Sequence, residues 1–294
     1  MVLTPDVESL AAIVEEVRGW DVDPDLAPLH VGDLGWNQQF GAAALAAALR
    51  VWHVDDRLAA VGLLDEPDLL RLTVAPELRE DEDFVRGFVA DLEAEDGRVL
   101  PAGEVAVEAR FAGPLHELLL ARGWAYDEPW TPLVRDLSQE VPETRLRVED
   151  VDPDRLDDRL AVHHAAFDRS TFTAERWRAL AQGPAYAHAR SLVGYDDRHV
   201  AVAMVTVWAG RPGGPGELEP MGVHRDHRGR GHGREICLAA AAALRAVAAA
   251  AALRAMGSSH AFVSTPSGNV GGVATYRAAG YDEKPQVRDL RRRA

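Results

Sequence analysis

A short stretch rich in glycine and arginine is the most chemically suggestive segment of this sequence. GVHRDHRGRGHGRE, residues 222–235, contains four arginines, three histidines and four glycines, and it follows a run typical of a strand. Such a composition suits three kinds of site: a loop that binds phosphate, a histidine metal site, or a basic segment for nucleic acid. The choice among them decides which function the sequence predicts.

The spacing of the glycines favours the phosphate loop. Gly229, Gly231 and Gly233 alternate where the predicted strand gives way to a long helix. Glycine lets successive backbone N–H groups turn toward one point, and the free N–H groups at a helix N-terminus attract anions. Arg228 and Arg230 would add charged contacts to phosphate oxygens. The loop has neither the Gly-Lys-Ser/Thr ending of a P-loop nor the G-x-G-x-x-G order of a dinucleotide fold.

The other two interpretations are weaker. His224, His227 and His232 have no second cluster of ligands in the sequence, so we expect no metal. Disordered Arg/Gly tracts that bind RNA do not stand between a strand and a helix. The net charge of −15 also argues against a nucleic-acid partner, which would require a basic face.

Charge and length indicate two dissimilar halves. Residues 1–140 carry 29 acidic and 10 basic side chains, whereas the remainder carries 18 and 22. A chain of 294 residues is long enough for two domains. The polar segment 137–145 contains a proline and lacks periodicity, so we place the junction there and predict domains at 1–140 and 145–294.

The composition also indicates the compartment. No apolar leader opens the sequence, and the long alanine-rich run near residues 238–253 is too weakly lipophilic for a membrane span. The single cysteine, Cys237, excludes an internal disulfide framework and suits a reducing environment. We therefore expect a cytoplasmic protein without a membrane partner.

The two halves repeat each other. Residues 51–64 and 193–207 both place an Asp-Asp-Arg turn between apolar strands, which predicts a hairpin in each half. Residues 121–137 and 278–290 both pass from Gly and an aromatic residue to a strand ending in Val-Arg-Asp-Leu. Two copies of one fold explain this repetition.

The second half mixes helices with a largely antiparallel sheet, an α/β (α+β) class. Thr173 is the expected N-cap of a short helix through Leu180. We predict strands at 145–148, 191–195, 200–209, 217–223, 261–264 and 286–290, and helices at 153–167, 173–180, 231–256 and 271–279.

Two motifs in the second half resemble the GNAT superfamily of acetyl-CoA-dependent N-acetyltransferases. The run from Arg228 to Gly233 matches the Arg/Gln-x-x-Gly-x-Gly/Ala signature, and Val223 stands where these enzymes end their splayed strand. Asn269, Tyr276 and the Gly280-Tyr281 pair reproduce a second motif, with Gly272 where alanine is usual. The resemblance covers residues 145–290.

The first half resembles a degenerate copy. Its counterpart of the loop, LTVAPELREDEDF at residues 72–84, keeps Val74 at the strand end but has lost the glycines and gained acidic side chains. These would repel a pyrophosphate, so we expect no cofactor in this domain. A degenerate first copy followed by an intact second one is similar to bacterial two-domain GNAT enzymes of the mycothiol synthase type. This resemblance implies a mixed, mostly antiparallel sheet in each half.

The resemblance implies direct attack of a primary amine of a small molecule on acetyl-CoA, in a ternary complex. It implies that Asn269 holds the pantetheine arm and that Tyr276 protonates the leaving thiolate. The expected cofactor-binding residues are Met221, Gly222, Val223, Arg228, Gly229, Arg230, Gly231, His232, Gly233, Arg234, Asn269 and Tyr276.

The remaining roles are open on the sequence alone. Glu217 and Glu219 share one strand face, and either is a candidate base. Phe167 and Phe172 either line the acceptor pocket or belong to the core. Two other functions compete: a CoA-binding sensing module without turnover, and acetylation of a protein. The chain is expected to be a monomer or a homodimer.

Overall fold

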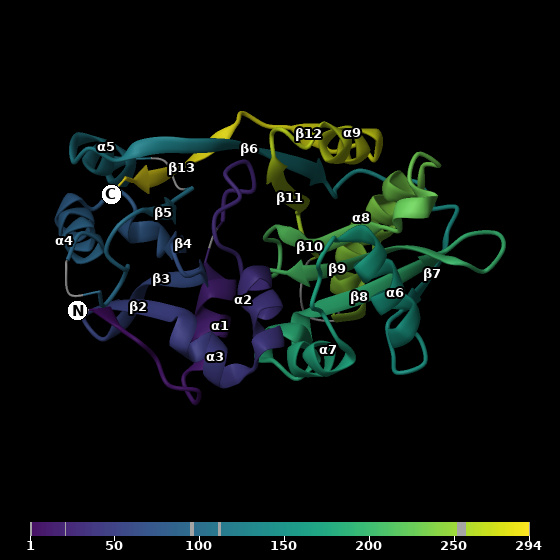
Figure 1. Cartoon of the computed structure of the whole chain (residues 1–294), viewed down its shortest axis with the longest axis horizontal. Helices are drawn as coiled ribbons and strands as arrows, with labels where there is room; N and C mark the ends of the chain where they lie inside the picture. Colours follow the sequence, from purple (N-terminus) through teal and green to yellow (C-terminus); the bar gives the residue numbers. More distant parts are fainter. Residues whose placement is uncertain (1, 21, 95–96, 111–112, 252–256, 294) are drawn as a thin grey trace.

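One continuous sheet runs through both halves of the chain (Figure 1). The computed structural model describes residues 2–20, 22–94, 97–110, 113–251 and 257–293. Within them the strand order is β1-β2-β3-β4-β5-β13-β6-β11-β10-β9-β8-β7, with β12 beside β6. The strands are β1 (Val2–Leu3), β2 (Leu49–Val54), β3 (Arg57–Glu66), β4 (Leu69–Val74), β5 (Val105–Glu108), β6 (Ala125–Asp136), β7 (Arg147–Asp150), β8 (Ala189–Tyr195), β9 (Ala201–Ala209), β10 (Gly216–Val223), β11 (His260–Pro266), β12 (Asp282–Glu283) and β13 (Val287–Arg292).

The halves share one plan, which confirms the predicted fold class. Each has an antiparallel ladder that ends in one parallel pair, β4 with β5 in the first half and β10 with β11 in the second. Helices flank the sheet: α1 (Leu10–Gly19), α2 (Val31–Asn37), α3 (Ala42–Ala48), α4 (Glu82–Leu92), α5 (Pro114–Ala121), α6 (Leu156–Ala166), α7 (Ala174–Ala181), α8 (His232–Ala251) and α9 (Val270–Ala278). Within the described residues, none of them is long and apolar enough to cross a bilayer.

The two halves exchange their closing strands. The C-terminal half of β6 pairs with β11, so the last strand of the first half extends the sheet of the second. In return β13 lies between β5 and the N-terminal half of β6. In Figure 1 the yellow β13 accordingly lies among the blue strands of the first half. The halves are therefore joined by backbone hydrogen bonds as well as by side chains.

The apolar cores follow the same plan. One cluster packs α8 and α9 on the second half of the sheet, with Ile236 and Leu244 at its centre. Another packs α4 and α5 on the first half and includes Leu290 of β13. A third spans the halves, because Val31 and Leu34 of α2 share it with Trp208 of β9. Burial of this third cluster adds an apolar link between the halves.

The elements predicted for the second half are present, with shifted bounds. Thr173 is the N-cap of α7, and its hydroxyl accepts a hydrogen bond from the Arg176 N–H. Both predicted hairpins form, β2 with β3 and β8 with β9. Helix α6 begins at Leu156, after a turn that follows Pro153. The short strand β12 was not predicted, and residues 252–256 of the long helix lie outside the described residues.

The strand exchange predicts that the two halves unfold together. Leu290 belongs to the second half by sequence but is fully buried in the core of the first. Replacing Leu290 by alanine removes buried methyl groups and should lower the free energy of unfolding by about 2–5 kcal/mol. Urea unfolding followed by tryptophan fluorescence should show one transition at a lower midpoint. Val270→Ala, at a 74% exposed position, is the control and should change little; two separate transitions would contradict the prediction.

Candidate active site

Strands β10 and β11 separate after a short parallel contact. Gly216 and Glu217 pair with Ala261 and Phe262, and the contact between the strands ends there. Farther along β10, residues 221–223 pair only with β9 among the described strands. Their other edge faces the gap between β10 and β11, so backbone groups of Met221, Gly222 and Val223 are available to an extended ligand.

The glycine loop follows β10 and leads into α8. Gly229 and Gly231 have φ angles of 75° and 86°, which side chains other than glycine rarely adopt. A Cβ on Gly233 would lie 2.7 Å from Thr275 Cγ2, so this glycine allows α8 to approach α9. Helix α8 begins at His232, and its first turn directs free N–H groups toward the loop. This geometry fits an anion, as the sequence predicts.

The arginines of the loop differ in what they contact. Arg228 Nη2 donates to the Ala166 carbonyl at 2.8 Å. Arg225 donates to the carbonyls of His164 and Ala165. Arg234 Nε donates to the Ala278 carbonyl at 3.0 Å. These arginines therefore satisfy carbonyls at the ends of α6 and α9. Arg230 is exposed and makes no hydrogen bond or ion pair with another described residue, which leaves its guanidinium available to a ligand.

Tyr276 and Asn269 belong to α9. Tyr276 is buried, and this burial raises the pKa of its hydroxyl well above 10, so the phenol stays protonated. Asn269 is the N-cap of α9: its Oδ1 accepts from the Gly272 N–H, and its Nδ2 donates to Thr265 Oγ1. A Cβ on Gly272 would lie 2.4 Å from Asn269 Nδ2. This contact explains why glycine replaces the alanine that is usual in the motif.

The two glutamates of β10 have different surroundings. Glu217 is buried, and its Oε2 lies 3.2 Å from His30 Nδ1 of the first half. Glu219 keeps part of its surface exposed, and its carboxylate has no hydrogen-bond partner among the described residues. Burial, followed by the charge of Glu217, raises the pKa of Glu219 to about 8. Of the two, Glu219 is free to exchange a proton near neutral pH.

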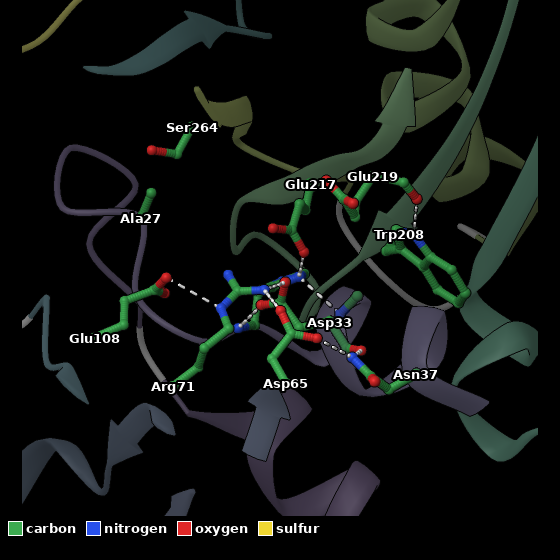
Figure 2. Close-up of polar contacts among 12 residues, drawn as sticks. Ala27, Asp33, Asn37, Asp65, Arg71, Glu108, Trp208, Glu217, Glu219 and Ser264 are labelled. Carbon is green, nitrogen blue, oxygen red and sulfur yellow. Dashed lines mark hydrogen bonds and ion pairs between the residues drawn. The ribbon is translucent and has the colours of Figure 1, made fainter. Parts of the chain in front are cut away.

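The first half contributes a charged network to this site, which Figure 2 shows below the two glutamates. Arg71 Nη1 lies 2.6 Å from Asp33 Oδ1 and 3.8 Å from Asp65 Oδ2, and Arg71 Nε lies 3.1 Å from Glu108 Oε2. Burial raises the pKa of both Asp33 and Glu108; Arg71 opposes the shift of Asp33, and Arg110 followed by Arg71 opposes that of Glu108. Acidic side chains thus outnumber Arg71 at this end of β10.

Sequence reasoning missed the residues of the first half that reach the site. Trp208 Nε1 donates to the Glu219 carbonyl at 2.6 Å, and its indole lies against Gly32 and Gly35 of α2. The two glycines three residues apart in a short helix, VGDLGWN, were a sequence signal of close packing. Nothing in the sequence indicated that β9 is what they contact.

The two phenylalanines predicted to bind the acceptor lie in different surroundings. Phe167 is 38% exposed, and a Cβ on Gly222 would lie 3.2 Å from its ring, so it borders the end of β10. Phe172 is 2% exposed and stacks on Trp36 with 5.1 Å between the ring centroids. Cys237 is fully buried, and burial raises the pKa of its thiol. Phe172 and Cys237 therefore present almost no surface to a ligand.

A cavity elsewhere on the surface and the histidines of the loop complete the description. A surface cavity of about 600 Å³ is formed by β1, α1 and the β2–β3 hairpin, on the far side of the first half, and shares no residue with the site. Across the described part of the chain, no group of three or more His, Cys, Asp or Glu side chains is placed to hold a metal ion. His224 and His227 instead contact each other, with ring centroids 5.2 Å apart.

Comparison with known proteins finds a family match in the second half of the chain. Residues 153–281 match the model of the "Acetyltransferase (GNAT) family". A search of curated proteins finds no match to the sequence. Among solved structures, a tandem GNAT protein from the clavulanic acid biosynthesis pathway is 15% identical, with a TM-score of 0.57 over 99% of this chain and 98% of that one.

Two further solved structures are similar over nearly the whole chain. A GNAT-family acetyltransferase from Colwellia psychrerythraea is 14% identical with a TM-score of 0.56, covering 99% of this chain and 98% of that one. A GCN5-related N-acetyltransferase from Sphaerobacter thermophilus is 18% identical with a TM-score of 0.51, covering 99% and 95%. These likenesses establish the tandem fold, and the second half of the chain, at residues 153–281, matches the GNAT acetyltransferase family, whose members are acyltransferases.

Proposed function

We propose that the protein transfers an acetyl group from acetyl-CoA to a primary amine of a small molecule, with Glu219 as the general base and Tyr276 as the general acid. The observation that carries this proposal is the state of Glu219. Glu219 is partly exposed near the point where β10 leaves β11, and burial raises its pKa to about 8. A base is most effective when its pKa lies near the working pH.

The residues around the gap fit acetyl-CoA. The free edge of β10 at residues 221–223 suits the amide groups of a pantetheine arm, and the loop of Gly229 and Gly231 suits a pyrophosphate. Arg230 supplies a guanidinium that no other described residue uses. Bound acetyl-CoA would supply the activated thioester. The side chain of Asn269 is engaged in capping α9, so we assign it to shaping this end of the gap.

The residues of the chain then divide the proton transfers between them. An incoming ammonium group must lose a proton before it can attack, and the carboxylate of Glu219 accepts that proton directly or through water. The neutral phenol of Tyr276 carries the proton that the departing thiolate needs. Backbone N–H groups on the free edge of β10 polarise the carbonyl that is attacked. No side chain forms a covalent bond to the acetyl group.

The acceptor side of the gap favours a cationic small molecule. Asp65 remains 33% exposed beside Arg71, and Glu217 and Glu219 face the same region (Figure 2). Carboxylates in such number attract an ammonium group and raise its local concentration. Charged side chains of both halves, Asp65 and Arg71 of the first and Glu219 of the second, border this region. The strand and loop at residues 72–84 supply no glycine, so we assign a single cofactor site to the chain.

Replacement of Glu219 by glutamine tests the base. In the unchanged protein, kcat/KM should rise as the pH increases through about 8, because the protonated carboxyl cannot accept a proton. The variant should lose that rise and about 10²–10⁴-fold in rate. The measurement is acetyl transfer to a panel of small amines between pH 6 and 10. An unchanged profile in the variant would remove Glu219 from this role.

Replacement of Tyr276 by phenylalanine tests the acid and separates an enzyme from a sensing module. Acetyl transfer should fall by about 10²-fold or more, because the leaving thiolate loses its proton donor. The affinity for acetyl-CoA, measured by calorimetry, should stay the same. A protein that binds acetyl-CoA but transfers it to none of the amines, with or without Tyr276, would instead be a sensing module.

Replacement of Gly231 by valine tests the cofactor loop. The unchanged protein should bind one acetyl-CoA per chain in a calorimetric titration, and the variant should bind none, because valine disfavours a φ of 86°. Gly123 is a matched control: it has a φ of 88° and equally open surroundings, but lies in the first half. Gly123→Val should strain the chain similarly and leave binding intact. Two molecules bound per chain would contradict a single site.

A further inference from the structure

We infer that Trp208, held in place by Gly32 and Gly35 of helix α2, is the positioning residue for Glu219, so that the first half of the chain forms part of the transfer site. This inference rests on the proposed role of Glu219 and adds a function for the first half. It follows from a chain of contacts that starts at Glu219 and ends in the network around Arg71.

The first contact fixes the backbone of Glu219. In the β9–β10 ladder Leu218 pairs with Val207 and Met221 with Val205, so Glu219 and Pro220 together face Thr206 as a bulge. A bulge takes backbone groups out of the ladder and turns a side chain in a new direction. The Glu219 carbonyl accepts its hydrogen bond from Trp208 Nε1 instead, at 2.6 Å. The indole therefore holds the bulge that presents the carboxylate.

The second contact fixes the indole. Trp208 is fully buried, and α2 presents Gly32 and Gly35 to its face. A Cβ on Gly35 would lie 2.2 Å from Trp208 Cζ3, and one on Gly32 would lie 2.8 Å from Trp208 Cγ. Any larger side chain at either position would push the ring away. The indole can therefore keep its position only because the helix is bare along this face.

The third set of contacts fixes α2 on the sheet of the first half. His30 and Asp33 form a capping box at the start of the helix, and Asp33 also pairs with Arg71 of β4. At the other end Asn37 Nδ2 donates to Asp65 Oδ1 of β3 at 3.0 Å. Because these partners are buried or half-buried, the helix is held at both ends. The first half of the chain therefore determines where α2 lies, and α2 determines where the Trp208 indole lies.

The same arrangement determines which charges Glu219 meets. Glu217, Asp65 and Glu108 disfavour its ionised form, and Arg71 favours it. Besides burial, the charge of Glu219 contributes to the raised pKa of Tyr276 on α9. A shift of the bulge changes the distances to all of these groups, so the ionisation of Glu219 reports its position independently of turnover.

Trp208→Phe tests the inference, because it keeps an aromatic ring and removes the N–H. We expect kcat to fall by about 10- to 100-fold, as for a slightly misplaced catalytic group, with the affinity for acetyl-CoA unchanged. The pH at which Glu219 titrates, followed by carbon NMR of labelled glutamate carboxyls, should also move. Trp177→Phe is the matched control: Trp177 Nε1 is buried and makes no hydrogen bond, so the same exchange should alter neither quantity.

A double variant separates positioning from stability. Gly35→Ala should lower both the melting temperature and kcat, since its methyl group would overlap the six-membered ring of the indole. Adding Trp208→Phe removes that ring, so the melting temperature should recover while kcat stays low. Gly87→Ala, in α4 and with open surroundings, should change neither.

The outcomes also separate this inference from the proposed function. If the unchanged protein acetylates no amine, the proposed function fails, but the titration of Glu219 still tests the inference. If Trp208→Phe leaves both kcat and that titration as they were, the inference is overturned even in an active enzyme. Recovery of kcat in the double variant would overturn it as well, because the hydrogen bond would then be dispensable.

Discussion

The close packing of a bare helix face against one buried indole is the contact on which the site depends. Helix α2 has only seven residues, and two of them are glycines that face Trp208. Short helices gain little stability from their own hydrogen bonds and take their position from what they pack against. Here the packing belongs to the apolar cluster that both halves share. The contact that joins the halves therefore also fixes the geometry of β10.

The electrostatics of the site follow from that join. Strand β10 of the second half brings Glu217 and Glu219 against Asp33, Glu108 and Arg71 of the first. Burial disfavours the ionised carboxyls and their mutual repulsion adds to this effect, so the pKa values of Asp33, Glu108 and Glu219 rise although Arg71 opposes the shift. A base with a raised pKa therefore arises from burial together with the crowding of acids from both halves.

The sequence predicted the parts of the fold that depend on local pattern. The glycine loop, the Thr173 cap and the two hairpins depend on neighbouring residues, so their residue types sufficed. The two-copy fold was predicted because the halves repeat the same turns. The contacts of the loop arginines could not be predicted from the sequence, because they depend on distant residues. Arg228, for example, donates to a carbonyl of α6 that lies 62 positions earlier in the chain.

The contribution of the first half to the site escaped prediction for the same reason. Gly32 and Gly35 meet Trp208 across more than 170 residues of sequence, and a single sequence offers no signal for so distant a pair. The sequence showed that the first half is acidic, but the pairing of Arg71 with three carboxylates depends on strand order. Register and strand order become visible only in three dimensions.

The exchanged strands also set an order of events during synthesis. The N-terminal half of β6 and the edge of β5 receive their shared neighbour only when residues 287–292 have been made. Until then the first half exposes two strand edges, and open edges recruit other chains. The ribosome thus completes most of the second domain before the first can close. A gene cut between the halves would yield two proteins that each lack a central strand.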